Sequence, residues 1–195
     1  MDDLRDGWTR LNEAPEPWVE DMPGFDGEPD MPGVYVRTLN LNVDDRGSLI
    51  ELFRGSWSFR LRGNDRWPKS EPDDGVNQVY VSETDRGVIK GWHLHRVQTD
   101  RFVCLAGRLR LVLCDLRPLS RTQHQYREFT LDARAPKLVL VPPMVAHGWI
   151  SFRDGSKILN AVTHEYDGTD EYRLDPSVAP ATGLPPYDWR KVVDG

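Results

Sequence analysis

Short segments of alternating apolar and polar residues, separated by turn residues, are the feature that most constrains the fold of this chain. The clearest is Arg108–Asp115, in which Leu109, Leu111 and Leu113 recur at every second position. That period places the leucines on one face of a half-buried β-strand. Turn residues recur about every 8–12 positions from Val34 onward, which is typical of an all-β sandwich or barrel. No competing helical periodicity is present.

The same reasoning predicts further strands on both sides of this segment. They cover residues 34–39, 48–53, 76–81, 87–95, 137–141, 146–152 and 157–163. Residues 54–75 are polar and contain several glycines and prolines, so we expect a loop there with room for a short helix.

The beginning of the chain differs from the rest in composition. Residues 1–32 contain five prolines among many acidic residues, together with Trp8 and Trp18. Tryptophans usually pack against other apolar groups, so we expect an arm that packs on this domain or on a second subunit. Residues 33–195 are predicted to form one domain, which suits a chain of 195 residues.

Composition also disfavours several classes of protein. The net charge of −6 argues against a protein that binds nucleic acid through phosphate contacts. No window approaches the ~18 consecutive apolar residues of a membrane span, and no signal peptide is visible. Cys104 and Cys114 lie in apolar stretches, so we expect buried thiols rather than a disulfide. These features favour a cytoplasmic protein.

A group of histidines and one aspartate indicates where chemistry takes place. His93 and His95 are two residues apart on a predicted strand, so both side chains leave one face of the sheet. Asp100 follows five residues later, and His147 lies on a later predicted strand. If the strands between them close a barrel, the four residues converge. Such a set suits one divalent metal (Fe, Mn, Ni or Zn), a metal-free catalytic site, or a merely hydrated interior.

The spacing of these residues resembles the cupin superfamily. The first cupin motif is matched by Gly87, His93, His95, Asp100 and Gly107. Asp100 stands where the superfamily normally has glutamate. Residues 142–147 resemble the second motif, with Met144 in place of its glycine and Ser151 in place of its asparagine. The resemblance implies a cupin double-stranded β-helix, or jelly roll, with the site inside the mouth of the barrel.

A closer resemblance, over roughly residues 34–176, is to the dTDP-4-dehydrorhamnose 3,5-epimerase family, a cupin branch that acts on nucleotide-linked 4-keto sugars. The matching motifs are Asp45-Arg46-Gly47 with Glu51, Gln78 with Ser82, Lys90-Gly91-Trp92-His93, Asp115-Leu116-Arg117, Pro142 to Gly148, and Asp175-Pro176. Their order and spacing agree with the family. The resemblance implies an isomerase of deoxysugar or polysaccharide biosynthesis that works as a homodimer.

The resemblance also implies roles for individual residues. His93 corresponds to the family's catalytic base. The positions implied to bind substrate are Arg46, Glu51, Gln78, Lys90, Arg117 and Asn160. Arg46 and Glu51 correspond to residues that serve the nucleotide end, and Arg46 with Lys90 suits a diphosphate. The competing interpretation of Arg46 and Lys90 is an ion pair with a neighbouring carboxylate.

Two departures from the family pattern affect the predicted mechanism. The family tyrosine taken as general acid aligns with Asn160, which has no titrating proton. The family aspartate that pairs with the catalytic histidine lies in a C-terminal segment without a counterpart here, so the dyad is predicted to be incomplete. Because His95 and Asp100 replace a glutamine and a lysine, the site gains metal-ligand character.

The role of His93 therefore has two mutually exclusive versions. Without a metal, His93 is the base that removes a proton beside the C4 ketone, and Lys90 or His147 faces the enolate oxygen. With a metal, His93 is a ligand beside His95, Asp100 and His147, and another residue is the base. Tyr166 and Glu165 are then the candidates by their spacing.

These observations predict a sugar-nucleotide epimerase or isomerase that acts on a 4-keto deoxysugar nucleotide. One alternative is a metal-dependent cupin enzyme, an oxygenase or isomerase with a non-nucleotide substrate. Another is a non-catalytic carbohydrate-binding cupin, which the Asn160 departure supports. Neither nucleic acid nor a membrane is an expected partner.

Overall fold

The fold is known from a computed structural model that describes residues 30–54, 57 and 75–191. Within these residues the regular structure consists of β-strands. They are β1 (Tyr35–Thr38), β2 (Leu41–Asp44), β3 (Gly47–Ile50), β4 (Gln78–Thr84), β5 (Ile89–Leu94), β6 (Asp100–Ala106), β7 (Arg108–Asp115), β8 (Tyr126–Asp132), β9 (Lys137–Val141), β10 (Val145–Ser151), β11 (Ser156–Val162) and β12 (Tyr172–Arg173).

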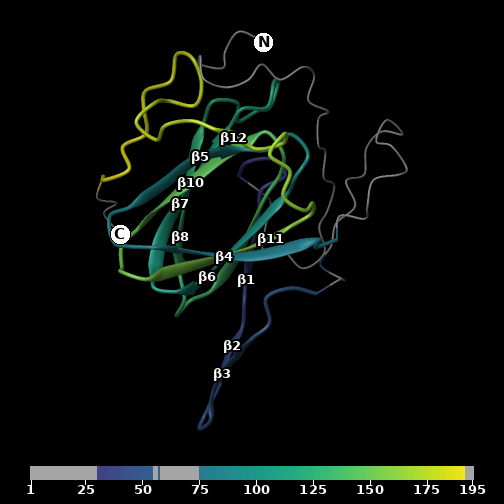
Figure 1. Ribbon diagram of the computed structural model, residues 1–195, viewed down its shortest axis with the longest axis vertical. Coiled ribbons are helices and arrows are strands. Elements are labelled where there is room, and N and C mark those ends of the chain that lie inside the picture. Colours follow the sequence, from purple (N-terminus) through teal and green to yellow (C-terminus); the bar gives the residue numbers. More distant parts are fainter. Residues whose placement is uncertain (1–29, 55–56, 58–74, 192–195) are drawn as a thin grey trace.

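The strands form two five-stranded antiparallel sheets that face one another (Figure 1). One sheet has the order β1-β9-β6-β11-β4 and the other β12-β5-β10-β7-β8. Consecutive strands along the chain often lie in opposite sheets, as in a jelly roll. The predicted all-β cupin jelly roll is therefore confirmed. A separate hairpin of β2 and β3 projects from the body (Figure 1).

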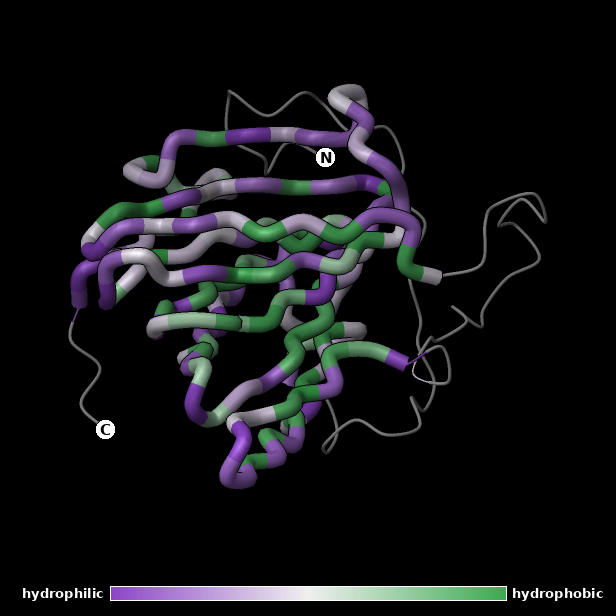
Figure 2. The backbone as a smooth tube through the Cα atoms, turned by 60° about the horizontal axis from the view of Figure 1, so that its bottom comes forward, coloured by the Kyte–Doolittle hydropathy of each residue, from purple (hydrophilic) through white to green (hydrophobic). Residues whose placement is uncertain are grey.

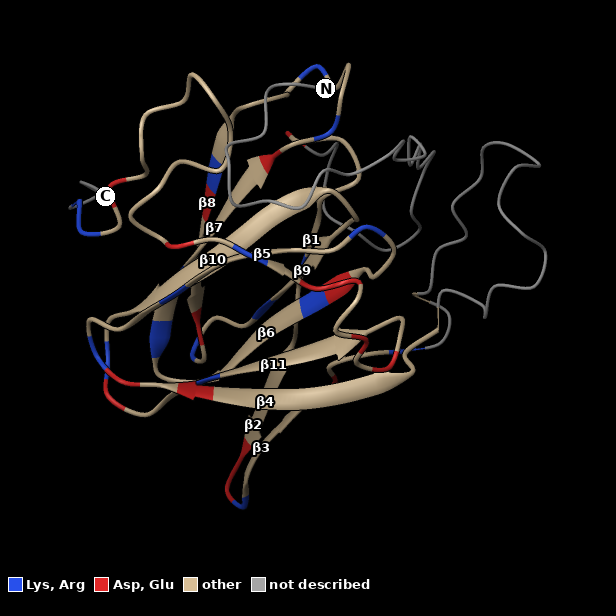
Figure 3. Ribbon diagram, turned by 45° about the horizontal axis from the view of Figure 1, so that its top comes forward, with Lys and Arg blue, Asp and Glu red and all other residues tan. Residues whose placement is uncertain are grey.

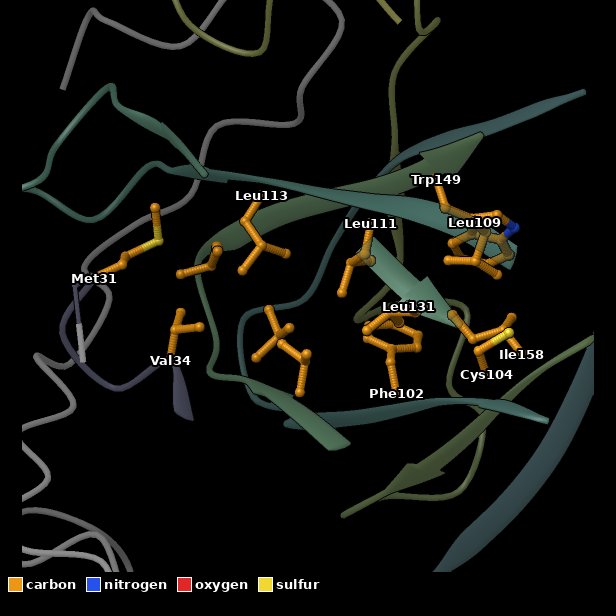
Figure 4. Close-up of a cluster of buried hydrophobic side chains, with 13 residues drawn as sticks. Met31, Val34, Phe102, Cys104, Leu109, Leu111, Leu113, Leu131, Trp149 and Ile158 are labelled. Atoms are coloured by element: carbon orange, nitrogen blue, oxygen red, sulfur yellow. The ribbon is translucent and has the colours of Figure 1, made fainter. Parts of the chain in front are cut away.

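Apolar side chains from both sheets fill the space between them. Leu109, Leu111 and Leu113 of β7 are each 0% exposed and pack with Phe102 of β6 and Ile158 of β11 (Figure 4). Hydrophilic and hydrophobic residues are interspersed along several of the strands, as expected where successive side chains face opposite sides of a sheet (Figure 2). The charged residues gather mainly at turns and strand ends (Figure 3).

The prediction that β7 is only half buried is wrong. Its other face carries Val112 and Cys114, both 0% exposed, which belong to a second apolar cluster with Trp92, Tyr187 and Trp189. The segment near the C-terminus therefore covers the outer face of this sheet.

Cys104 and Cys114 are buried free thiols, as predicted, and burial raises the pKa of the Cys104 thiol to about 11.

Some strands were not predicted, most importantly β6, which starts at Asp100. Its residues 100–104 are all buried, so it lacks the alternation that identified β7. Of the predicted arm, residues 30–32 are described, and Met31 packs into the core at 1% exposure. Residues 1–29 and most of the predicted loop 54–75 lie outside the described residues, and their assignments stay predictions.

Nowhere in the described ranges does a helix have the length and apolar character needed to cross a bilayer. The cytoplasmic location stays a prediction.

Candidate active site

A pocket of about 520 Å³ opens between the two sheets, a volume typical of small-molecule sites. One wall comes from β4, and the other from β5 and β10 of the facing sheet. The segment between β11 and β12 contributes to the rim. The lining residues are Gln78, Tyr80, Ser82, Lys90, His93, His95, Val97, Gln98, Phe102, His147, Trp149, His164, Glu165, Tyr166, Asp167, Asp170, Glu171 and Arg173.

An irregularity in β5 brings Lys90 and His93 to the same wall. Lys90 pairs with Trp149 of β10 and His93 pairs with His147, so two residues on β5 oppose only Gly148 on β10. Such a bulge places residues three apart on one face, which a regular strand cannot do. The strands approach so closely here that a Cβ atom on Gly148 would lie 2.7 Å from the Cα atom of Gly91.

His93 has a carboxylate partner, which corrects the prediction of an incomplete dyad. The Nδ1 atom of His93 lies 3.1 Å from Oε1 of Glu171, which precedes β12. Arg173 is the register partner of His93 and donates two hydrogen bonds to the same carboxylate oxygen, at 2.9 and 3.1 Å. An ionised carboxylate only accepts hydrogen bonds, so Nδ1 carries the proton and Nε2 keeps its lone pair.

The electrostatics of this pair suit a general base. Burial lowers the pKa of His93, and the hydrogen bond and charge of Glu171 offset only part of this effect. Burial alone would raise the pKa of Glu171, but hydrogen bonds from Arg173 and His93 hold it below its usual value. At neutral pH the arrangement is therefore a neutral imidazole beside a carboxylate, and the carboxylate stabilises the imidazolium that forms when Nε2 accepts a proton.

Next to His93 lies a group that we call the floor cluster, composed of His95, Asp100 and His147, and the ring of His147 is stacked 6.0 Å from that of His93. One ligand atom from each residue lies within 4.8 Å of the others. The Nε2 atoms of His95 and His147 lie 4.0 and 3.9 Å from Oδ2 of Asp100. His93 is not a member of this cluster. The candidate base and the candidate metal ligands are thus different residues, so the two predicted versions of the site no longer compete for His93.

The hydrogen bonds of the floor histidines fix which ring nitrogen carries the proton. Nδ1 of His95 lies 3.0 Å from the carbonyl oxygen of Asp170, and Nδ1 of His147 lies 3.2 Å from that of Val145. Carbonyl oxygens only accept, so each Nδ1 is protonated. The amide nitrogen of Gln98 lies 3.3 Å from Nε2 of His95 and can only donate, so this Nε2 is an acceptor. Burial lowers the pKa of His147 to about 4. A neutral His147 with a bare Nε2 cannot donate to an enolate oxygen, which excludes one of its predicted roles.

Lys90 is the remaining predicted donor to the enolate oxygen of the substrate. Its Nζ atom donates to Oγ of Ser82 and to the carbonyl oxygen of Glu83, both at 2.7 Å. Both acceptors are neutral, and no ion pair of Lys90 exists within the described residues. The positive charge of Lys90 is therefore available to an anionic group in the pocket.

The loop that carries Glu171 is tied to the turn between β5 and β6. The carboxylate of Asp170 accepts hydrogen bonds from the backbone N–H groups of Arg96, Val97 and Gln98, at 2.8 to 3.3 Å. This contact fixes the chain directly before Glu171. Asp170 is therefore a positioning residue for the His93 pair.

The structure places the other predicted site residues in two groups. Gln78, Lys90 and Tyr166 line the pocket, and Tyr166 is 69% exposed on the rim. Arg117 and Asn160 do not line it, which corrects their predicted contact with substrate. Arg117 is 5% exposed and forms a forked ion pair with Asp115, with two contacts of 2.8 Å.

Asn160 is 0% exposed, and its amide forms hydrogen bonds with neighbouring side chains. Its Nδ2 atom donates to the hydroxyl oxygen of Tyr80 and to Oδ1 of Asp100, each at 2.8 Å. Gln98 donates to the same Asp100 oxygen at 2.9 Å. Both of these hydrogen bonds go to Oδ1, and Oδ2 of Asp100 is the oxygen nearest to the floor histidines.

Arg46 and Glu51 lie away from the pocket of their own chain. Arg46 occupies the turn of the β2–β3 hairpin, with its side chain 89% exposed and paired with Asp44 (Figures 1 and 3). Glu51 pairs with Arg54 at 2.6 Å. These ion pairs match the competing interpretation of Arg46, and neither residue can contact substrate within one subunit in this arrangement.

Among the site residues that sequence reasoning missed are Tyr80, Glu171 and Arg173. Tyr80 had a detectable signal, because it lies between Gln78 and Ser82 at the two-residue spacing of one strand face. Glu171 and Arg173 had none, because β12 is only two residues long and its pairing with β5 depends on tertiary structure.

Comparison with known proteins agrees with the geometry. A barrel of this topology, with histidines inside its mouth, defines a cupin. A family profile described as dTDP-4-dehydrorhamnose 3,5-epimerase matches residues 28–182, and the chain belongs to that family. The reaction of this family needs no metal cofactor.

Individual relatives extend this finding. A probable low-salt glycan biosynthesis epimerase of Haloferax volcanii is 31% identical over 150 residues, covering 75% of this chain and 88% of the relative. A dTDP-4-dehydrorhamnose 3,5-epimerase of Mycobacterium tuberculosis is 26% identical, covering 86% and 78%. Among solved structures, a 4-keto-6-deoxy sugar epimerase from Streptomyces spheroides matches with a TM-score of 0.69 and 21% identity, covering 92% and 84%, and shows the shared fold.

Proposed function

We propose that this protein is an epimerase that inverts a carbon beside the ketone of a 4-keto deoxysugar nucleotide, with His93 as the base. The pair of His93 and Glu171 carries this proposal, together with membership of the family. A neutral imidazole with Nε2 directed by a carboxylate on Nδ1 is the arrangement that proton abstraction requires.

The reaction follows from the acidity of a C–H bond next to a carbonyl group. Nε2 of His93 removes the proton, and the electron pair of the C–H bond passes into the enolate. Glu171 stabilises the imidazolium, and Lys90 offers a cationic donor to the enolate oxygen or to the diphosphate. A second group then protonates the opposite face of the carbon, which inverts the centre.

The test is incorporation of solvent deuterium. The protein is incubated in D₂O with dTDP-, UDP- and CDP-linked 4-keto-6-deoxyhexoses, and the sugar protons are followed by NMR. We expect deuterium at each inverted carbon with at least one of these substrates. His93→Asn should reduce the rate by about 10²–10⁴-fold, the usual contribution of general base catalysis.

The matched control is His124→Asn. His124 lies in the turn before β8, outside the pocket, with a φ of 61° that asparagine tolerates. This variant should exchange at the wild-type rate. Exchange that survives in His93→Asn, or its absence from the wild-type protein with every substrate, would contradict the proposal. The latter result together with sugar binding would favour the non-catalytic alternative.

We also propose a homodimer in which the β2–β3 hairpin of one protomer completes the site of its partner. The hairpin exposes Val43 and Leu49, at 72% and 65%. The strand β4 exposes Val79 and Val81, at 55% and 51%, and among the described strands it pairs with β11 alone, at the edge of its sheet. Apolar side chains on a projecting hairpin and on an edge strand favour burial in an interface. Arg46 would reach the nucleotide end from the partner.

This arrangement is tested by mixing two inactive variants. Arg46→Ala and His93→Asn are each purified, unfolded together and refolded. If Arg46 acts across the interface, mixed dimers contain one intact site and recover activity that neither variant has alone. Sedimentation should show a dimer. A monomer, or no recovery in verified mixed dimers, would refute the arrangement.

A second candidate function is supported by the floor cluster, which suits a divalent metal. Two Nε2 acceptors and one carboxylate oxygen converge, and both Nδ1–H groups are held by carbonyl oxygens, as in typical metal-ligating histidines. A bound metal would act there as a Lewis acid toward a substrate oxygen. This cluster is the basis for the alternative of a metal-dependent cupin enzyme.

Elemental analysis distinguishes the two candidates. Untagged protein, purified without chelator, is compared with His95→Gln, which removes one ligand but leaves His93 and Glu171 in place. Near-stoichiometric metal that is lost in the variant would support the metal-dependent candidate. Metal-free protein with full deuterium exchange would refute it.

A further inference from the structure

The proposed epimerisation needs an acid on the side of the sugar opposite His93, and the position of the family's tyrosine holds Asn160. Asn160 is fully buried and does not line the pocket, so it cannot reach the substrate. The side chain directly beside it is a tyrosine. Asn160 of β11 and Tyr80 of β4 are register partners, so both side chains leave the same face of the sheet.

Tyr80 faces His93 across the pocket. Both residues line it, but β4 is the edge strand of one sheet and β5 belongs to the facing sheet. A sugar bound between the sheets would therefore present one face to each residue. That is the placement required of an acid and a base that invert one carbon.

The hydrogen bonds of Asn160 determine what the hydroxyl group of Tyr80 can do. The Oδ1 atom of Asn160 accepts a hydrogen bond from the backbone N–H of Arg101 at 2.9 Å, which fixes the orientation of the amide. Its Nδ2 atom donates to the hydroxyl oxygen of Tyr80. The oxygen of Tyr80 is thus an acceptor in this contact, and its own proton has no acceptor within the described residues.

We propose that Tyr80 is the general acid of the epimerisation and donates its hydroxyl proton to the carbanion on the face opposite His93. This inference rests on the proposed function. The O–H bond of Tyr80 breaks as the new C–H bond forms, and the amide of Asn160 stabilises the phenolate oxygen that remains. Solvent then returns a proton to Tyr80 and takes one from His93.

The charge state of Tyr80 agrees with this role. Burial and the negative charge of Asp100 raise its pKa to about 12, so the hydroxyl is protonated at neutral pH. Tyr166, the tyrosine that the sequence singled out, lies on the exposed rim loop. The pairing of β4 with β11 and the amide of Asn160 hold Tyr80 in place, whereas Tyr166 is 69% exposed.

The test separates proton removal from inversion. The probe is dTDP-4-keto-6-deoxyglucose deuterated beside the ketone, and two rates are measured in H₂O: loss of deuterium and formation of the epimer. Tyr80→Phe leaves His93 able to remove the deuteron and return a proton to the same face. We expect epimer formation to fall by about 10²–10⁴-fold while deuterium loss continues.

Several results would overturn the proposal. Unchanged epimer formation in Tyr80→Phe would exclude an acid at this position. A proportional fall in both rates would mean that Tyr80 only shapes the pocket. The matched variant Tyr166→Phe should leave the ratio of the two rates unchanged, and if it alone separates them, Tyr166 is the acid.

A second variant guards against a folding defect. Tyr80→Gln keeps an acceptor for Asn160 but has no acidic proton, so it should show the same separation of rates as Tyr80→Phe. Failure of the proposed function would look different, because the wild-type protein would then neither lose deuterium nor form an epimer. That outcome would refute both the proposed function and the role of Tyr80.

Discussion

Replacing Glu171 with glutamine removes one charge from the site without changing its shape, and the structure determines how the amide would sit. His93 and Arg173 both donate to Oε1 of Glu171, and Nη2 of Arg173 also reaches Oε2 at 3.0 Å. If the amide oxygen of glutamine takes the Oε1 position, it still accepts the hydrogen bonds from His93 and Arg173. The NH₂ group then takes the Oε2 position and faces one N–H of Arg173. In the flipped orientation the NH₂ group would face the N–H donors of both His93 and Arg173. We therefore expect the first orientation.

This geometry sets the magnitude of the expected loss. In the first orientation Nδ1 of His93 stays protonated and Nε2 remains the base, so the tautomer is preserved. What is lost is the charge that stabilises the imidazolium, and a hydrogen bond to a charged group contributes about 1.5–3 kcal/mol. Since about 1.4 kcal/mol corresponds to a tenfold change in a rate constant, kcat/KM should fall by about 10- to 150-fold. Because Arg173 already balances the carboxylate, we expect the lower half of that range.

The pH dependence of kcat/KM gives the sign of the effect. The carboxylate of Glu171 raises the pKa of His93, and the charge of Arg173 lowers it. The acid limb marks protonation of the free His93 base, so Glu171→Gln should move this limb to lower pH. Arg173→Gln should move it to higher pH. The assay is epimer formation with dTDP-4-keto-6-deoxyglucose between about pH 4 and 8, which covers the usual titration range of histidine.

Two results would refute this reasoning. One is an unchanged kcat/KM in Glu171→Gln, which would mean that the pair is only structural. The other is a shift of the acid limb in the same direction for both variants, since the two charges act on His93 with opposite signs.

Three further predictions concern the elements that support the site. Gly148→Ala should cost about 1–3 kcal/mol and lower the activity, because its Cβ atom would meet the backbone of Gly91, as thermal unfolding and kcat/KM will show. Asp170→Ala should lower kcat more than it lowers the melting temperature, because the loop before Glu171 loses its anchor; Asp170→Asn should restore part of kcat. Asp115→Asn should cost about 3–5 kcal/mol at pH 7 in urea unfolding, because Arg117 would lose its partner in a buried ion pair. Burial alone would raise the pKa of Asp115, but the hydrogen bonds and charge of Arg117 hold it below its usual value. The stabilisation is therefore present above the unfolded pKa of about 4 and is lost as the pH falls, so the difference from wild type should shrink in acid.

The sequence predicted the features of this protein that depend on local pattern. The leucines of β7 were identified by their period of two, and they form the centre of the core. His93 and His147 were placed at one site because β5 and β10 were correctly identified, and His95, also predicted to lie on a strand, directly follows β5. Both results follow from alternation, which is a property of the strand itself.

The contacts that depend on tertiary structure were not predictable in the same way. Glu171 reaches His93 only because a two-residue strand pairs with β5 after a long irregular segment. Arg117 matched a family motif and was assigned to substrate, but its guanidinium is held by Asp115 in the interior. A sequence pattern identifies which residues carry chemistry, whereas burial and pairing decide what they contact.

The anchor at Asp170 divides the segment between β11 and β12 into two parts with different freedom to change. The part before it, which includes His164 and Tyr166, lines the rim of the pocket and carries no residue of the catalytic pair. The part after it carries Glu171. Substitutions in the first part can alter which sugar fits without disturbing proton abstraction, because the anchored backbone at Asp170 separates the rim residues from Glu171. The segment is therefore a place where new substrate preferences can evolve at little risk to catalysis.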